Sequence, residues 1–214
     1  MPDFGFGFYQ KNLMGIANPH IGLYFGSFNP IHIGHIKVAK YLKKYGKFDS
    51  IWFVPSPLNP QKSEEMLLPA NLRLNWVKKA IAEDPDFKIC DVEFGLGMPS
   101  YTYRTVKHLY SMYSGHIFSL LMGADNLIDF HSWNDAQKLA QICPLHVYAR
   151  PGFLKPSGEI PFNAKWYDSP LLDISATQIR NLLFEKKDIG GLIPASILLD
   201  VETFFQNFIA ESNQ

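Results

Sequence analysis

The chain has 214 residues, of which 47% are hydrophobic and 14% aromatic, and its 20 lysines and arginines balance its 20 aspartates and glutamates. This length favours a single domain, the apolar fraction excludes a disordered chain, and zero formal charge argues against a dedicated nucleic-acid-binding protein. Two cysteines are too few for a disulfide scaffold and no apolar run approaches the ~18 residues of a membrane span, so we expect a cytoplasmic protein without membrane contact.

Strand-like and helix-like segments alternate along the chain. Apolar residues at helical spacing (Ile36, Ala39 and Leu42) predict the first helix, and four prolines between positions 55 and 69 predict a loop. The expected strands cover 21–25, 50–54, 87–92, 116–122, 145–149 and 166–168. The expected helices cover 33–45, 69–83, 101–113, 135–142, 175–185 and 194–209.

This alternation is typical of an α/β protein with a Rossmann-like, doubly wound and mostly parallel sheet that carries helices on both faces. In such a sheet, ligands bind beyond the carboxyl ends of the strands, at the switch point of the strand order. We expect residues 1–20 to form an N-terminal extension and residues 21–214 to form one domain, whose last part, about 175–210, is helical.

A cluster of polar and small residues, GSFNPIHIGH, follows the first strand and opens the first helix. Gly26 permits a tight turn there, and the helix N-terminus favours an anion. His32 and His35 are three residues apart, so they share one face of that helix end. The combination suits a polyphosphate. An ordinary loop with structural histidines stays open as an alternative, as does a zinc pair, although no third ligand stands out.

A second cluster, DISATQIR, opens a late helix. Ser175 and Gln178 match a capping box, and a well-capped helix with an exposed arginine is the plain interpretation. The functional interpretation is a second phosphate cradle made of the helix amides, the hydroxyls of Ser175 and Thr177, and the fork-shaped guanidinium of Arg180.

Together the two clusters resemble the signatures of the nucleotidyltransferases with the HxGH motif, a superfamily that includes class I aminoacyl-tRNA synthetases. ISATQIR at 174–180 is similar to its form in bacterial nicotinate-nucleotide adenylyltransferases. Further matches follow in the expected order, and the resemblance covers about residues 21–209. They are Lys62 in NPQK, Ser100-Tyr101-Thr102, Gly123-Ala124-Asp125, Trp133, Arg150-Pro151-Gly152 and Leu192-Ile193-Pro194.

The resemblance implies an enzyme of NAD biosynthesis that transfers AMP from ATP to nicotinate mononucleotide, forming deamido-NAD and pyrophosphate, with Mg²⁺ and no metal-ligating side chain. It implies catalytic roles for His32, His35 and Arg180. The implied ATP-binding residues are Gly26, Ser27, Phe28, His32, His35, Lys62, Gly123, Asp125, Ile174, Ser175, Thr177 and Arg180. The implied nicotinate-nucleotide-binding residues are Ser27, Phe28, Asn29, Tyr101, Thr102, Trp133 and Arg150. The partners are then small molecules and not nucleic acid, and a homo-oligomer stays open.

Each intervening residue also has an ordinary structural interpretation. The alternatives are a core role for Trp133, a helix cap for Asp125, a solvated Lys62, a surface ion pair for Arg150 and a surface position for Thr102. Two positions depart from the family pattern: Asn29 stands where aspartate is common, and Asn134 stands where an aromatic residue often follows the tryptophan.

Other functions stay open beside this one. The acceptor could be nicotinamide mononucleotide or phosphopantetheine, and the chain could be a synthetase fragment or a non-catalytic nucleotide sensor. All the nucleotidyltransferase interpretations require that His32, His35 and Arg180 meet at one cleft.

Overall fold

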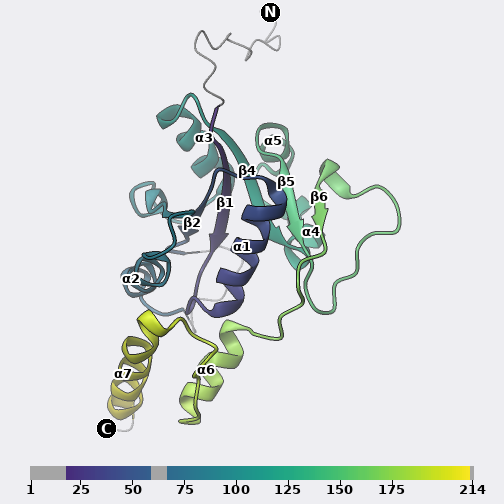
Figure 1. The fold of residues 1–214 in the computed structure, drawn as a ribbon. Coiled ribbons are helices and arrows are strands. Elements are labelled where there is room, and N and C mark those ends of the chain that lie inside the picture. The colour runs from purple at the N-terminus through teal and green to yellow at the C-terminus, as the bar shows by residue number, and fades with distance from the viewer. Residues whose placement is uncertain (1–17, 59–66, 213–214) are drawn as a thin grey trace, which may run out of the picture.

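Six parallel strands form the centre of the protein in a computed structural model that describes residues 18–58 and 67–212. The strand order is β3-β2-β1-β4-β5-β6, and every neighbouring pair is parallel (Figure 1). This arrangement confirms the predicted doubly wound α/β fold, with the switch point between β1 and β4. The strands are β1 (His20–Gly26), β2 (Ser50–Pro55), β3 (Phe87–Ile89), β4 (Ile117–Gly123), β5 (Leu145–Tyr148) and β6 (Lys165–Tyr167).

Seven α-helices lie within the described residues. They are α1 (Ile33–Gly46), α2 (Ala70–Ile81), α3 (Thr102–Met112), α4 (Ala124–Asp129), α5 (Ala136–Ile142), α6 (Ala176–Phe184) and α7 (Ala195–Ser212). One sequence expectation was wrong in detail, and one helix was missed. The strand expected at 87–92 ends at Ile89, because only three of its residues pair with β2, and α4 was not predicted because six residues are too few to show a helical period.

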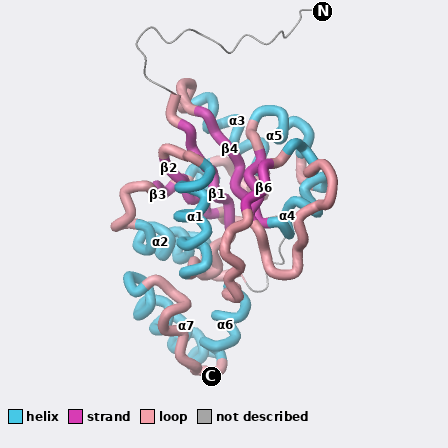
Figure 2. Tube along the Cα trace, turned by 45° about the vertical axis from the view of Figure 1, so that its right-hand side comes forward, coloured by secondary structure: helices cyan, strands magenta, loops and turns pink. Residues whose placement is uncertain are grey.

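The helices cover both faces of the sheet, as Figure 2 shows. Successive residues of a strand point to opposite faces, so Tyr24 packs in the core beneath α1, α2, α6 and α7, whereas Leu23 packs in the core beneath α3, α4 and α5. Both cores are mainly apolar, and the polar clusters lie at the strand ends.

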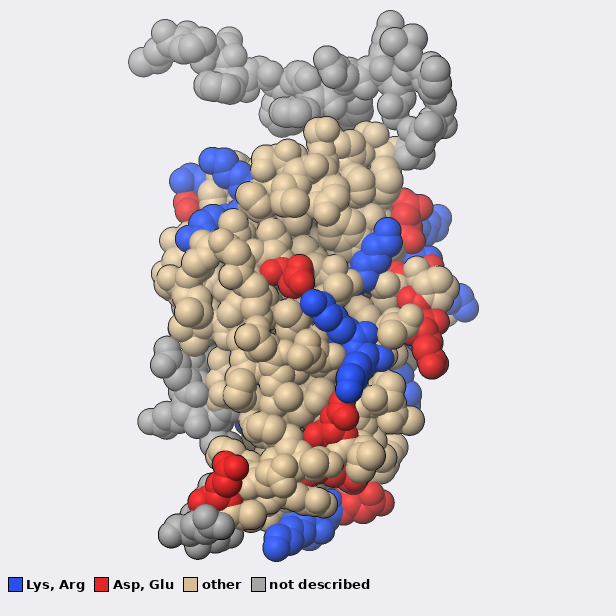
Figure 3. Space-filling model, turned by 90° about the vertical axis from the view of Figure 1, so that its left-hand side faces the viewer, with Lys and Arg blue, Asp and Glu red and all other residues tan. Residues whose placement is uncertain are grey.

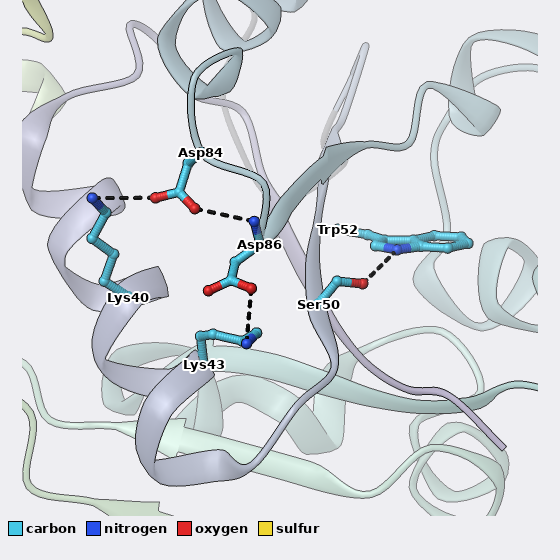
Figure 4. Close-up of polar contacts among 6 residues, drawn as sticks. All are labelled: Lys40, Lys43, Ser50, Trp52, Asp84 and Asp86. Atoms are coloured by element: carbon cyan, nitrogen blue, oxygen red, sulfur yellow. Dashed lines mark hydrogen bonds and ion pairs between the residues drawn. The ribbon is translucent and has the colours of Figure 1, made fainter. Parts of the chain in front are cut away.

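Ion pairs fix the second half of α1 against the segment before β3 (Figure 4). Lys40 lies 3.2 Å from Asp84 and Lys43 lies 2.9 Å from Asp86, while the Asp86 amide donates to the Asp84 carboxylate. Exposed pairs of this kind contribute only about 0–1 kcal/mol each. They therefore add little to the stability of the fold.

The helices α6 and α7 lie beyond the carboxyl ends of the strands (Figure 1). The Ile33 amide at the start of α1 donates to the Leu192 carbonyl at 2.9 Å, and Lys79 of α2 pairs with Asp200 of α7. Basic side chains lie beside acidic ones on the face shown in Figure 3. The C-terminal helices thus join the sheet at the carboxyl ends of the strands, while the expected domain limits stay a prediction.

Across the described residues, no helix is both long and apolar enough to cross a membrane.

Two histidines, the buried His146 and the half-buried His20, lie in the amino-terminal half of the sheet, away from the polar clusters. The His146 ring bonds the Tyr167 hydroxyl at 2.8 Å, and the His20 ring bonds the Ser119 hydroxyl at 2.8 Å. Burial, helped by His20 and Lys165, lowers the pKa of His146 to about 4. The His146 ring takes up a proton near pH 6.5 in the unfolded chain but only near pH 4 in the folded chain. Lowering the pH between these two values therefore favours unfolding.

We therefore expect the free energy of unfolding to fall by roughly 2–3 kcal/mol from the His146 contribution between pH 7 and pH 4.5. Urea unfolding of the wild type and of His146→Gln at both values measures this contribution. The exposed His131→Gln is the control. An equal loss of stability in His146→Gln and wild type would contradict the prediction.

Candidate active site

The histidine pair lies where β1 gives way to α1. His32 is the residue before the helix and His35 is in its first turn, and the two rings lie 3.7 Å apart. The His32 main-chain N–H donates to Nδ1 of His35 at 3.2 Å. Because Nδ1 accepts this bond, the proton of the neutral His35 ring lies on Nε2. The pair thus has a defined tautomer at the helix N-terminus.

His32 is uncharged at neutral pH, so it can donate a hydrogen bond but carries no positive charge. The side chain is 4% exposed, and burial, followed by the charge of Arg150, lowers its pKa to about 3. Its buried Nδ1 has no hydrogen-bond partner among the residues the structure describes. Buried polar atoms are normally partnered, so this atom indicates a site that a ligand or water completes.

Gly34 makes room for the His32 ring. A β-carbon at position 34 would lie 2.9 Å from both Cε1 and Nδ1 of that ring. We expect Gly34→Ala to displace the ring and to lower stability by about 1–3 kcal/mol, although alanine favours a helix. Thermal unfolding and the imidazole NMR signals of His32 measure both effects. Gly115→Ala, where a β-carbon meets nothing within 4 Å, is the control and should be neutral. Unchanged His32 signals in Gly34→Ala would refute the steric argument.

The second cluster begins α6. The Ser175 hydroxyl accepts the Gln178 amide at 3.1 Å, which is the expected helix cap. Arg180 donates from Nη1 to the Asn29 carbonyl at 2.8 Å and from Nη2 to the Thr177 hydroxyl at 3.3 Å. Asn29 belongs to the loop that leads to His32, so this bond brings the two clusters together across 151 residues of sequence.

A large hollow of about 460 Å³ opens at the carboxyl ends of β1 and β4. Six of the predicted residues line it, namely Gly26, Ser27, Tyr101, Thr102, Gly123 and Trp133. The indole Nε1 of Trp133 and the hydroxyl of Ser27 are buried without a hydrogen-bond partner in the described part of the chain. The hollow therefore combines aromatic surface with unused polar groups, as binding sites for small molecules do. Trp133 also packs against Phe130 of the core at 5.3 Å, so its core interpretation is partly right.

A narrow hollow lies beside the histidine pair. His32, Gly34, His35, Arg150 and Ile174 line it together with residues of β5 and the 170–172 segment. Arg150 lies 3.5 Å from the Asp125 carboxylate, so two predicted residues form the ion pair that was the ordinary interpretation of Arg150. Asp125 is in the first turn of α4 and Gly123 is its N-cap, so Asp125 is not the helix cap.

Six predicted residues within the described part of the chain line neither hollow, namely Phe28, Asn29, Asp125, Ser175, Thr177 and Arg180. The Phe28 ring is buried against Tyr24, His35 and Phe53, and the residue adopts a φ of 44°, which is costly for an aromatic residue. The Asn29 amide oxygen accepts the Leu68 amide at 3.0 Å. Contacts of these two residues with a ligand must therefore come mainly from the main chain. Lys62 lies outside the described residues.

Sequence reasoning missed two buried charged residues that hold the walls of the large hollow. Arg73 donates to the carbonyls of Leu68, Ser27, Ser56 and Pro57. Glu93 accepts the hydroxyls of Ser56 at 2.7 Å and Thr105 at 2.8 Å, and burial raises its pKa. One feature of the sequence could have identified Arg73. It lies on the apolar face of a predicted helix, where an arginine is rare unless its charge is paired.

A Rossmann-like parallel sheet with a histidine pair and an arginine-bearing helix start at its switch point defines a nucleotidyltransferase of the HxGH type. Consistent with this class, residues 23–182 match the cytidylyltransferase-like family. The chain belongs to the nicotinate-nucleotide adenylyltransferase family, because it is 41% identical over 181 residues to a protein of Porphyromonas gingivalis named a probable nicotinate-nucleotide adenylyltransferase, covering 84% of this chain and 92% of that one. A Bacteroides fragilis protein of the same name is 40% identical over 174 residues, which are 81% of this chain and 87% of that one.

Solved structures agree in fold. A Plasmodium falciparum nicotinic acid mononucleotide adenylyltransferase, complexed with NaAD, superposes with a TM-score of 0.70 at 21% identity, over 91% of this chain and 96% of that one. A Vibrio parahaemolyticus structure described as a putative nicotinate-nucleotide adenylyltransferase has a TM-score of 0.63 at 20% identity, over 88% and 96% of the two chains. The resemblance stated from the sequence motifs is thereby confirmed at the level of family and fold.

Proposed function

We propose that the protein transfers AMP from ATP to nicotinate mononucleotide, forming nicotinate adenine dinucleotide and pyrophosphate. One observation supports the proposal: Arg180, in the helix that begins the second cluster, donates to the Asn29 carbonyl in the loop that leads to the histidine pair. Two helix N-termini and an arginine at one edge of the sheet suit a triphosphate. Family membership favours nicotinate mononucleotide as the acceptor.

The two clusters hold the triphosphate of ATP. His35 contacts the reacting α-phosphate through its Nε2 proton, and His32 donates to a neighbouring oxygen. Arg180 and the amides of 175–177 hold the β- and γ-phosphates, and Lys62 assists them. The glycines at the strand ends (Gly26 and Gly123), with Ser27, Phe28, Asp125 and Ile174, complete the ATP side.

The large hollow takes the acceptor. Trp133 stacks on the pyridine ring, while Tyr101, Thr102 and the amides at the start of α3 hold its carboxylate. The main chain of Ser27, Phe28 and Asn29, with Arg150, holds the acceptor phosphate. A neutral hollow with free donors suits a carboxylate on an aromatic ring.

The reaction is a direct displacement. An oxygen of the acceptor phosphate forms a bond to the α-phosphorus of ATP, the bond from that phosphorus to the β-bridging oxygen breaks, and pyrophosphate leaves with the electron pair. Positioning and charge stabilisation supply the catalysis. Within the described ranges, no three His, Cys, Asp or Glu side chains gather to hold a metal ion. Mg²⁺ keeps water and phosphate ligands readily, so we propose that it arrives bound to ATP in the cytoplasm.

A pyrophosphate-release assay with ATP and Mg²⁺ tests the function. Parallel reactions contain nicotinate mononucleotide, nicotinamide mononucleotide, phosphopantetheine or no acceptor. Release that depends on nicotinate mononucleotide, with the dinucleotide as product, supports the proposal. Higher kcat/KM with nicotinamide mononucleotide would reassign the acceptor. ATP binding without pyrophosphate release under every condition would instead support a nucleotide sensor.

A further inference from the structure

Two buried tyrosines form the boundary between the large and the narrow hollow. Tyr24 ends the buried part of β1 and Tyr148 ends β5, on either side of β4. They are the two described residues that line both hollows. Their hydroxyl oxygens lie 3.2 Å apart, and the side chains are 3% and 6% exposed.

The pair has one hydroxyl hydrogen to spare. One O–H donates to the other oxygen, and within the described residues the second O–H has no acceptor, since each hydroxyl has the other as its hydrogen-bond partner. Buried tyrosine hydroxyls usually find a partner. Burial and their mutual contact raise the pKa of Tyr24, and burial raises the pKa of Tyr148, so both hydroxyls keep their hydrogens at working pH.

The position of the pair matches the place where the two substrates meet. In the proposed function the acceptor occupies the large hollow, and the histidine pair lines the narrow one. The Tyr24 ring lies 6.2 Å from the His35 ring, edge to face. The charge of Arg150 acts on both hydroxyls, and so does the opposite charge of Asp125, its ion-pair partner at 3.5 Å.

We propose that the Tyr24–Tyr148 hydroxyl pair donates a hydrogen bond to a phosphate oxygen at the junction of the two hollows. This inference rests on the proposed function for the identity of the phosphates. The oxygen belongs either to the acceptor phosphate or to the α-phosphate of ATP. One tyrosine makes the contact, and the other orients its hydroxyl.

The double variant Tyr24→Phe/Tyr148→Phe removes the pair and keeps both rings. Replacing both partners by apolar groups of the same shape is nearly neutral for stability, so we expect an unfolding temperature within about 2–4 °C of wild type. We expect kcat to fall by about tenfold or more, because a bond to a charged oxygen is lost. Tyr110→Phe is the control for kcat, since its hydroxyl donates to the Ile142 carbonyl and accepts from the Phe118 amide outside both hollows.

Calorimetry with a non-hydrolysable ATP analogue alone, and with nicotinate mononucleotide alone, distinguishes the two sources of the oxygen. Weaker binding of one of them in the double variant assigns the oxygen to that nucleotide. If the double variant is poorly folded, the single variants carry the test: the one without the contacting hydroxyl should show the full loss. A double variant with kcat and both affinities within twofold of wild type overturns the proposal. If wild type releases no pyrophosphate, the proposed function fails and the pair is judged by the binding measurements alone.

Discussion

His35→Ala should lower kcat for pyrophosphate release by about 10²–10³. The His35 ring has its Nδ1 occupied by the His32 main-chain N–H, which leaves the Nε2 proton for an oxygen that gains charge in the transition state. The loss should appear in kcat more than in KM, since the bond strengthens as the reaction proceeds. Steady-state kinetics with saturating ATP and nicotinate mononucleotide measure it.

Two matched variants sharpen this experiment. His35→Gln keeps an N–H donor on a side chain of similar reach, so it should retain more activity than His35→Ala. The exposed His131→Ala lies on the short turn after α4 and should be neutral. Turnover of His35→Ala within threefold of wild type would remove His35 from this role.

Arg73→Met should lower the free energy of unfolding by about 3–5 kcal/mol. The Arg73 side chain is fully buried, and its guanidinium donates to the Ser27 carbonyl at 2.5 Å, the Ser56 carbonyl at 2.8 Å and the Pro57 carbonyl at 2.7 Å. Burial lowers its pKa only to about 10, so the charge persists at neutral pH. Methionine fills the volume but leaves these carbonyls without their donor.

Urea unfolding compares this variant with two others. Arg73→Lys supplies three donors in a different geometry and should fall between wild type and Arg73→Met. Arg104→Met is the surface control, because Arg104 also bonds main-chain carbonyls (Leu96 and Gly97) but is exposed, and it should cost less than about 1 kcal/mol. If Arg73→Met and Arg104→Met lower the free energy of unfolding equally, the buried hydrogen bonds of Arg73 stabilise the fold no more than the exposed ones of Arg104, and the prediction is wrong.

The local patterns predicted most elements because their signals are short-range. The helix that begins at Ile33 and the strand that ends at Gly26 follow from apolar spacing and from a turn residue at the strand end. The Ser175 cap is likewise a contact over three residues. The six-residue helix α4 escaped prediction because it is shorter than two helical periods and its ends carry no distinctive cap.

The buried polar contacts that build the site have no such local signal. Arg73 and Glu93 are single charged residues in sequence, and their partners lie 5 to 46 and 12 to 37 positions away. The tyrosine pair spans 124 positions. Such partners become visible only when parallel strands bring distant segments to one edge, because a hydrogen bond depends on spatial proximity and not on sequence spacing.

The amino-acid sequence by itself thus determined the alternation of strands and helices, the motifs at their ends and the family to which they belong. These features depend on periodicity, turn residues and capping, which act within a few residues. Only the tertiary structure decided that Arg180 contacts the loop before His32, that Phe28 faces the core, and that Tyr24 and Tyr148 separate two hollows. Those outcomes depend on strand order and on side-chain packing across the sheet, which no local pattern encodes.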